Sequence, residues 1–127
     1  IDDPAERVAV AHRHLVLAVA EDPDWAWLLV RLEVPHNVTD AVLGEHAMAD
    51  LRAGIDRGRF HVASPRVALR ASGGALISVM HGLLTGEFGP EAGSEHAEGV
   101  LRSFGVGDAE AAEIVRRPLP EAAGPGG

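Results

Sequence analysis

Residues 50–70 have the sequence DLRAGIDRGRFHVASPRVALR, in which one helical pattern ends and the next begins within a few residues. Gly58 can end the first helix, because glycine adopts a left-handed backbone conformation at little cost. Ser64 followed by Pro65 is a typical helix start, with the serine as N-cap and the proline in the first turn. We therefore expect residues 59–63 to form a sharp corner between two long antiparallel helices. Two apolar side chains in this corner can close the end of a helical bundle: Phe60 and Val62.

The rest of the chain carries similar start and stop signals. Asp3 is placed to cap one helix upstream, and Asp22 or Asp24 a second. Asn37 or Thr39 can cap the helix that leads into the corner. The first helix has apolar residues around most of its circumference, so we expect it to lie at the centre of the fold. The expected helices cover six segments: residues 2–22, 22–35, 37–58, 64–88, 91–105 and 108–117. Because no alternation of period two is present, the sequence predicts an all-α antiparallel helical bundle of about six helices.

The composition limits the classes of function. A chain of 127 residues fits one domain with a hydrophobic core. It contains no cysteine, which excludes disulfides, thiolate metal sites and cysteine nucleophiles. Its net charge of -8 argues against direct contact with nucleic acids or anionic lipids. Because it has neither a signal peptide nor an apolar run of about 18 residues, we expect a cytoplasmic protein without a membrane partner.

The fourth expected helix has more apolar surface than one domain can cover. Between Ala71 and Leu84 it carries no charge, and its residues are apolar or small on nearly every side. Such a surface normally marks a partner site, so we expect a homodimer built on this helix and the fifth. The expected interface consists of Gly74, Ile77, His81, Leu84, Phe88, Ala97, Val100, Leu101 and Phe104. The alternative is that the sixth helix and the tail fold back over this face.

Three segments together resemble the C-terminal regulatory domain of tetracycline-repressor (TetR) family transcription factors: ADLRAGIDRGRFHV at residues 49–62, ALRASGGALISVMHGLL at 68–84 and AEGVLRSFGVGDAEAAEIVRRPLP at 97–120. The resemblance implies a bacterial regulator with a ligand pocket among the first four helices and a two-fold dimer. It also implies that DNA is bound by a helix-turn-helix domain that precedes Ile1 and is missing here. No DNA-reading residue of the family has a counterpart in this sequence.

An apolar helix face is the starting point for a small-molecule pocket. One face of the second helix carries Trp25, Leu28, Leu29 and Leu32, and Trp27 points away from it. The side chains that we expect to border the pocket are Trp25, Leu28, Leu32, Leu76 and Met80, with His14, Arg31 or His46 as polar groups that orient a ligand. The alternative is that the same apolar residues are ordinary core. Trp27 covers the bundle surface or packs on the absent DNA-binding domain.

Metal binding and catalysis have weaker support. His12 and His14 diverge on a helix, and His46 with Asp50 could share an ion with Glu45 or Glu33 only if the fold brings them together. We therefore expect no metal and no cofactor. The candidate serine nucleophiles lie in helical segments without a strand-turn-helix elbow: Ser72, Ser78 and Ser103. The sequence therefore predicts no enzyme.

The hypothesis that combines these observations has two parts. Residues 1–117 form a helical ligand-binding and dimerisation domain, and residues 118–127 form a disordered tail. The domain binds a small apolar effector, homodimerises and controls an attached DNA-binding domain. A ligand-free helical dimerisation or scaffold module is the alternative.

Overall fold

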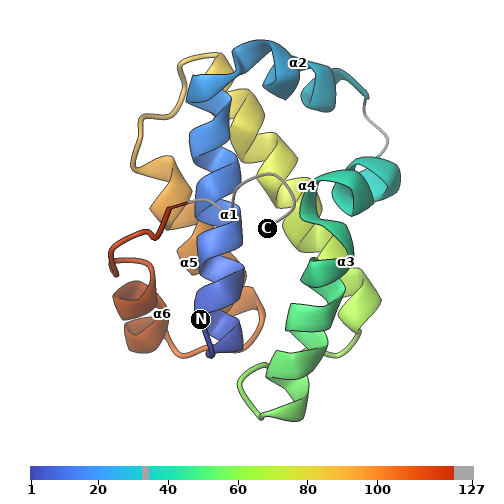
Figure 1. Ribbon diagram of the computed structural model, residues 1–127, viewed down its shortest axis with the longest axis vertical. Coiled ribbons are helices and arrows are strands. Elements are labelled where there is room, and N and C mark those ends of the chain that lie inside the picture. The colour runs from blue at the N-terminus through green and yellow to red at the C-terminus, as the bar shows by residue number, and fades with distance from the viewer. Residues whose placement is uncertain (33–34, 122–127) are drawn as a thin grey trace.

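The computed structural model describes residues 1–32 and 35–121, with the backbone alone for residues 35–45. These residues form six helices and no strand (Figure 1). The helices are α1 (Pro4–Glu21), α2 (Pro23–Leu32), α3 (Pro35–Asp56), α4 (Pro65–Leu84), α5 (Ala92–Ser103) and α6 (Asp108–Ile114). The expected all-α antiparallel bundle is confirmed. Residues 122–127 of the expected tail lie outside the described residues.

Side-chain caps start three of the helices as their sequences predict. The Ala5 N–H donates to Asp3 Oδ1 at 3.1 Å, and the Trp25 N–H donates to Asp22 Oδ1 at 3.1 Å. Ser64 Oγ accepts from the Val67 N–H at 3.2 Å. The prediction for α3 was wrong, because this helix begins at Pro35 and both Asn37 and Thr39 lie inside it. Proline is favoured in the first turn of a helix and disfavoured in its interior. Pro35 therefore begins α3, and α2 cannot continue through it.

Three helices end in the same way, with a glycine in the left-handed conformation. Gly58, Gly86 and Gly105 have φ angles of 73°, 80° and 94°. In each case the residue after the glycine donates to a carbonyl one turn back, as in Arg59 N–H to Gly54 O at 2.7 Å and Glu87 N–H to Gly82 O at 2.9 Å. This is the Schellman motif. The α3 and α4 ends share the pattern Gly-x-x-x-Gly-x-Phe, GIDRGRF and GLLTGEF, and in both the phenylalanine ring lies on the first glycine.

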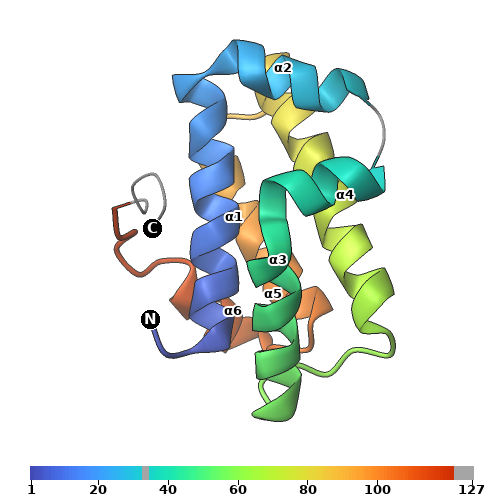
Figure 2. The same cartoon turned by 45° about the vertical axis from the view of Figure 1, so that its right-hand side comes forward.

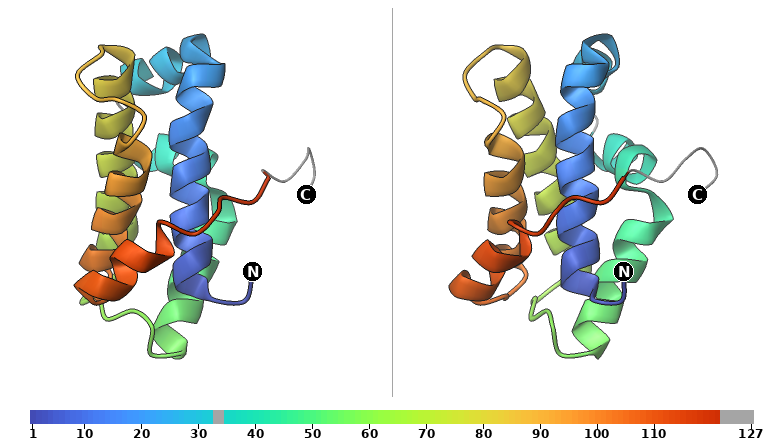
Figure 3. Two further views of the ribbon diagram at one scale, coloured as in Figure 1. Left: turned by 90° about the vertical axis from the view of Figure 1, so that its left-hand side faces the viewer. Right: turned by 60° about the vertical axis from the view of Figure 1, so that its left-hand side comes forward.

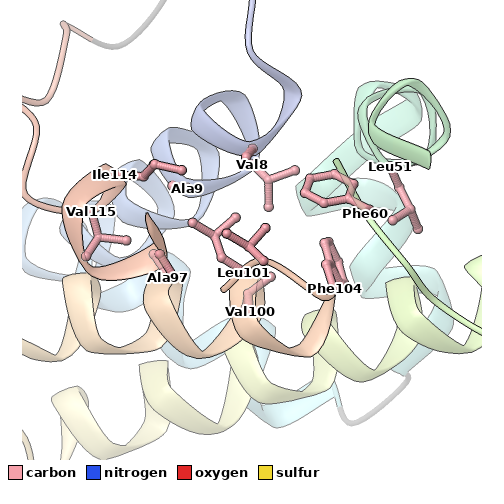
Figure 4. Close-up of a cluster of buried hydrophobic side chains, with 13 residues drawn as sticks. Val8, Ala9, Leu51, Phe60, Ala97, Val100, Leu101, Phe104, Ile114 and Val115 are labelled. Atoms are coloured by element: carbon pink, nitrogen blue, oxygen red, sulfur yellow. The ribbon is translucent and has the colours of Figure 1, made fainter. Parts of the chain in front are cut away.

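Helix α1 contacts all the other helices and is central, as its apolar circumference predicts (Figures 1 and 2). One core cluster lies where α1, α5 and α6 meet the corner after α3 (Figure 4). Phe60 and Phe104 meet there edge to face, with ring centroids 5.2 Å apart, and the His61 N–H donates to Phe104 O at 2.8 Å. Phe60 is buried and Val62 packs on the cluster, which confirms that the corner closes this end of the bundle.

A second core cluster occupies the other end, where α2 lies across α1 and α4 (Figure 2). Its buried members are Val16, Val19, Ala26, Leu29, Leu76 and Met80. Helix α2 turns Ala26 and Leu29 inward, whereas Leu28 is 58% exposed and Leu32 is 50% exposed. The expected inward face of α2 was therefore wrong for Leu28 and Leu32. The chain beyond α6 crosses α1 (Figure 3) and is held there by Arg13 Nη1, which donates to Arg117 O at 3.0 Å.

Candidate functional site

A cavity of about 50 Å³ lies between α1, α3, α4 and the end of α5. Its lining residues are Val8, Ala11, His12, His46, Ala47, Asp50, Leu69, Ser72 and Phe104. Ala11 and His46 are exposed and lie at its mouth, whereas His12, Ser72 and Phe104 are buried. The volume corresponds to roughly four water molecules, far below the approximately 300 Å³ of the smallest drug-sized pockets. A molecule that fits here has to be small.

One buried polar group of the cavity, His12, belongs to a pair of histidines. His12 on α1 and His96 on α5 are 4% and 9% exposed. His12 Nδ1 lies 2.8 Å from His96 Nε2, which is hydrogen-bonding distance. Burial lowers the pKa of His96 to about 4. Burial, followed by the repulsion of His96, lowers the pKa of His12 to about 3. Both rings are therefore neutral near pH 7, and a single N–H lies between them.

Two further polar groups of the cavity, Asp50 and Ser72, already have partners within the chain. Asp50 Oδ1 accepts from Arg7 Nε at 2.9 Å. The same arginine donates from Nη1 to the carbonyls of Ile1 and Asp2, each at 3.1 Å. Ser72 Oγ donates to Leu69 O at 2.9 Å, so its lone pairs remain for a ligand. Asp50 and Ser72 thus offer acceptors to the cavity, and a donor has to come from a histidine.

The structure disperses most of the residues that the sequence assigned to a pocket. His46 lines the cavity, but Leu76 and Met80 are buried in the second core cluster and Trp25 packs against it. Arg31 is exposed, with its guanidinium 5.3 Å from the centroid of the Trp27 ring. Trp27 in turn packs edge to face on His81 of α4, so it covers the bundle surface. His14 is half-buried, and its Nε2 atom is buried without a hydrogen-bond partner among the described residues.

Sequence reasoning missed eight of the lining residues, although some signals were present. Val8, Ala11 and His12 recur at helical spacing on α1, and His46 and Asp50 stand one turn apart on α3. The sequence predicts His46 as a pocket residue, but Asp50 only as a possible metal ligand. Within the described residues, no group of three or more acidic, histidine or cysteine side chains could hold a metal ion.

The α4 surface is largely uncovered in the single chain. By length and composition alone, helix α4 is long and apolar enough to cross a membrane: its most apolar 18-residue stretch has a mean hydropathy of 1.4. Only 28% of that stretch is buried inside the structure. Its outward stripe consists of Val67, Ala71, Gly74, Ala75, Ser78 and His81. Ile77 and Leu84, which we placed in the interface, are half-buried against the second core cluster. Phe88 is partly exposed and lies on Gly82.

The part of the expected interface on α5 is corrected by the structure. Ala97, Val100, Leu101 and Phe104 are all buried in the first core cluster of the same chain (Figure 4). They pack there because the apolar side of α5 faces α1 and α6. The residues that α5 exposes are instead Glu95, Gly99, Arg102 and Ser103.

The chain is similar to known proteins in both sequence and structure. The model of the family described as "Tetracyclin repressor-like, C-terminal domain" matches residues 3–117. A crystal structure of RolR in complex with its ligand resorcinol superimposes with a TM-score of 0.87 at 36% sequence identity, covering 97% of this chain and 61% of the RolR chain. RolR without ligand gives a TM-score of 0.83 at 36% identity, covering 95% of this chain and 62% of the other. The chain thus spans about three fifths of RolR. No curated protein sequence matches it.

Proposed function

The chain belongs to the tetracyclin repressor-like C-terminal domain family, and we propose that it binds a small-molecule effector in the α1–α3–α4–α5 cavity to regulate an attached DNA-binding domain. The observation that carries the proposal is this cavity, which combines an apolar lining with a few convergent polar groups. In this proposal the regulator is cytoplasmic, and DNA is contacted by a domain N-terminal to Ile1. A ligand-free scaffold, the alternative, gives no account of the cavity.

The effector that we propose is a single aromatic ring with hydroxyl groups. The cavity is too small for a drug-sized molecule, and its polar side chains offer both acceptors and a histidine donor, which suits a hydroxyl group. RolR, which shares the fold at 36% identity, binds resorcinol, a ring of this class. Resorcinol is therefore the first probe.

Calorimetric titration of the purified chain with resorcinol tests this proposal. We expect saturable binding that is lost in Ala47→Phe, because the larger side chain fills the cavity from α3. Ala49→Phe is the matched control, since Ala49 is exposed on the same helix and does not line the cavity. Equal binding by wild type and Ala47→Phe would place the ligand elsewhere. No binding of resorcinol, phenol or catechol by wild type would refute the effector class.

A route from the cavity to the start of the chain supports the regulatory part of the proposal. Asp50 lines the cavity and pairs with Arg7, which also holds the carbonyls of Ile1 and Asp2. A ligand that bonds to Asp50 changes the contact that positions these first residues. The ligand can change DNA binding only as far as it binds one arrangement of the domain more tightly than the other.

We further propose that the chain homodimerises through the outward stripe of α4. The middle of the stripe consists of small residues that allow close helix approach, and Val67 at one end is 66% exposed. A Cβ atom at Gly74 on α4 or at Gly99 on α5 would meet nothing within 4 Å, so no contact inside the chain requires these glycines. Helices α4 and α5 from two subunits would form a four-helix interface about a two-fold axis, burying at least roughly 1,200 Å².

Sedimentation equilibrium tests the dimer. We expect a dimer for wild type and a folded monomer for Ala71→Glu/Ser78→Glu, because four carboxylates would meet at the interface. The control is Ala20→Glu/Ala49→Glu, which adds the same charges at exposed positions on α1 and α3. A wild-type monomer at tens of micromolar would end the proposal.

A further inference from the structure

The His12–His96 pair gives the cavity a polar group whose hydrogen-bonding character is set from outside the cavity. His12 lines the cavity, but its Nδ1 atom faces His96, which does not. The ring nitrogen left for the cavity is therefore Nε2. A neutral imidazole carries one N–H, so Nε2 of His12 is a donor only if the shared N–H belongs to His96, and an acceptor otherwise.

The remaining lining groups decide between the two tautomers. The Asp50 carboxylate can only accept, and the Ser72 hydroxyl hydrogen is already donated to Leu69 O. His46 stands at the exposed mouth. A hydroxyl group that donates to Asp50 or Ser72 keeps lone pairs that need a donor deep in the cavity. A buried lone pair without a donor costs free energy, so the complementary state of His12 has its proton on Nε2.

We propose that His96 is a positioning residue that donates its Nε2–H to His12 Nδ1 and thereby fixes His12 as an uncharged N–H donor to the ligand. Resting on the effector site proposed above, this assignment predicts selection between ligand classes. A neutral donor satisfies a hydroxyl oxygen but does not offset the charge of a carboxylate. Among the described lining residues no arginine or lysine is present, and the nearby Arg7 already pairs with Asp50. The site therefore prefers phenols to benzoates.

Long-range ¹H–¹⁵N NMR of the ligand-free chain tests the tautomer directly. We expect a protonated Nε2 on His12, an unprotonated Nδ1, and a scalar coupling across the hydrogen bond to His96 Nε2. An unprotonated His12 Nε2 would overturn the proposal, whatever the chain binds.

Three substitutions of His96 then test its role in binding. His96→Leu removes the donor, His96→Gln places an amide N–H near the former Nε2, and His96→Asn, whose amide mimics Nδ1 and is too short, is the matched control. We expect the affinity for resorcinol to fall about tenfold in His96→Leu and His96→Asn and to recover in His96→Gln. The preference for resorcinol over benzoate should fall in the same two variants. Circular dichroism confirms that each variant is folded.

The outcomes separate this inference from the proposed effector site. If wild type binds resorcinol and all three variants bind it equally, the positioning role of His96 is wrong and the effector site stands. If wild type binds benzoate as tightly as resorcinol, the selection is wrong. If wild type binds no hydroxylated ring, both the effector proposal and the predicted preference for phenols are wrong. The NMR measurement of the His12 tautomer still tests the donor assignment in that case.

Discussion

The buried His12–His96 pair should make the protein less stable as the pH falls below about 6.5. In the folded chain both rings stay neutral, because burial lowers the pKa of His12 to about 3 and that of His96 to about 4. In the unfolded chain each ring takes up a proton near its ordinary pKa of about 6.5. The unfolded state therefore binds more protons in the window between these values. The free energy of unfolding is highest above this window and decreases as the pH falls through it.

The size of the effect follows from the two lowered pKa values. One pKa unit corresponds to about 1.4 kcal/mol. Between about pH 6.5 and about pH 5 each unfolded ring becomes protonated while its folded counterpart does not, which costs about 2 kcal/mol per ring and about 4 kcal/mol for the pair. A domain of this size has a total stability of about 5–15 kcal/mol, so the loss is a large fraction of it.

Urea unfolding at a fixed protein concentration measures this loss. The fluorescence of Trp25 and Trp27 and the circular dichroism of the helices report the transition between about pH 7.5 and about pH 5. The control is His12→Leu/His96→Leu, which removes both titrating rings and should flatten the dependence on pH. The reasoning is refuted if wild type loses less than about 1 kcal/mol over this range, or if the double variant loses as much as wild type.

Four further outcomes are expected from particular contacts. Gly58→Ala and Gly86→Ala should each lower the free energy of unfolding by about 1–2 kcal/mol, seen as a lower melting midpoint, because both have positive φ. Gly74→Ala should leave the free energy of unfolding of the monomer unchanged. Asp3→Asn should keep the N-cap of α1 and cost less than Asp3→Ala in urea unfolding, the remaining loss reflecting the ion pair with Arg59 at 3.0 Å. Arg7→Gln should loosen the backbone of residues 1–2, seen as lower NMR order parameters there, while the melting midpoint of the bundle changes little. The isolated chain, with a net charge of -8, should give no gel shift with duplex DNA at physiological salt, and a salt-sensitive micromolar shift would contradict this.

Helix ends were the most predictable part of the fold because their chemistry is local. Asp3, Ser64 and Gly58 act on backbone groups within a few residues, so the sequence around each contains all that is needed to place it. Pro35 shows the limit of this reasoning. Proline is compatible both with the end of one helix and with the first turn of the next, and the structure uses it for the start of α3.

The direction of each apolar face was less predictable, because periodicity tells which residues share a side and not what covers that side. On α5 the apolar stripe of Ala97, Val100 and Leu101 was correctly grouped, but it packs on α1 and α6 and not on a partner. On α2 the expected face holds both Leu28 and Leu29, but only Leu29 is buried, because this short helix lies across α1 and α4 at an angle that exposes the other side of the stripe. Such angles are set by packing between distant segments.

The cavity was the least predictable feature, since a cavity is a place where side chains fail to fill space between helices. It is lined by small residues such as Ala11 on α1 and Ala47 on α3, and nothing in the sequence states that they line the same space. The hydrogen-bonding character of its buried histidine depends on the contact of His12 with His96, 84 positions away. In the sequence neither histidine stands out from other histidines of helical segments. Only their buried contact makes them a neutral hydrogen-bonded pair, which a solvent-exposed histidine could not form. A search for paired buried histidines beside small-residue cavities would therefore find sites of this kind where motif spacing does not.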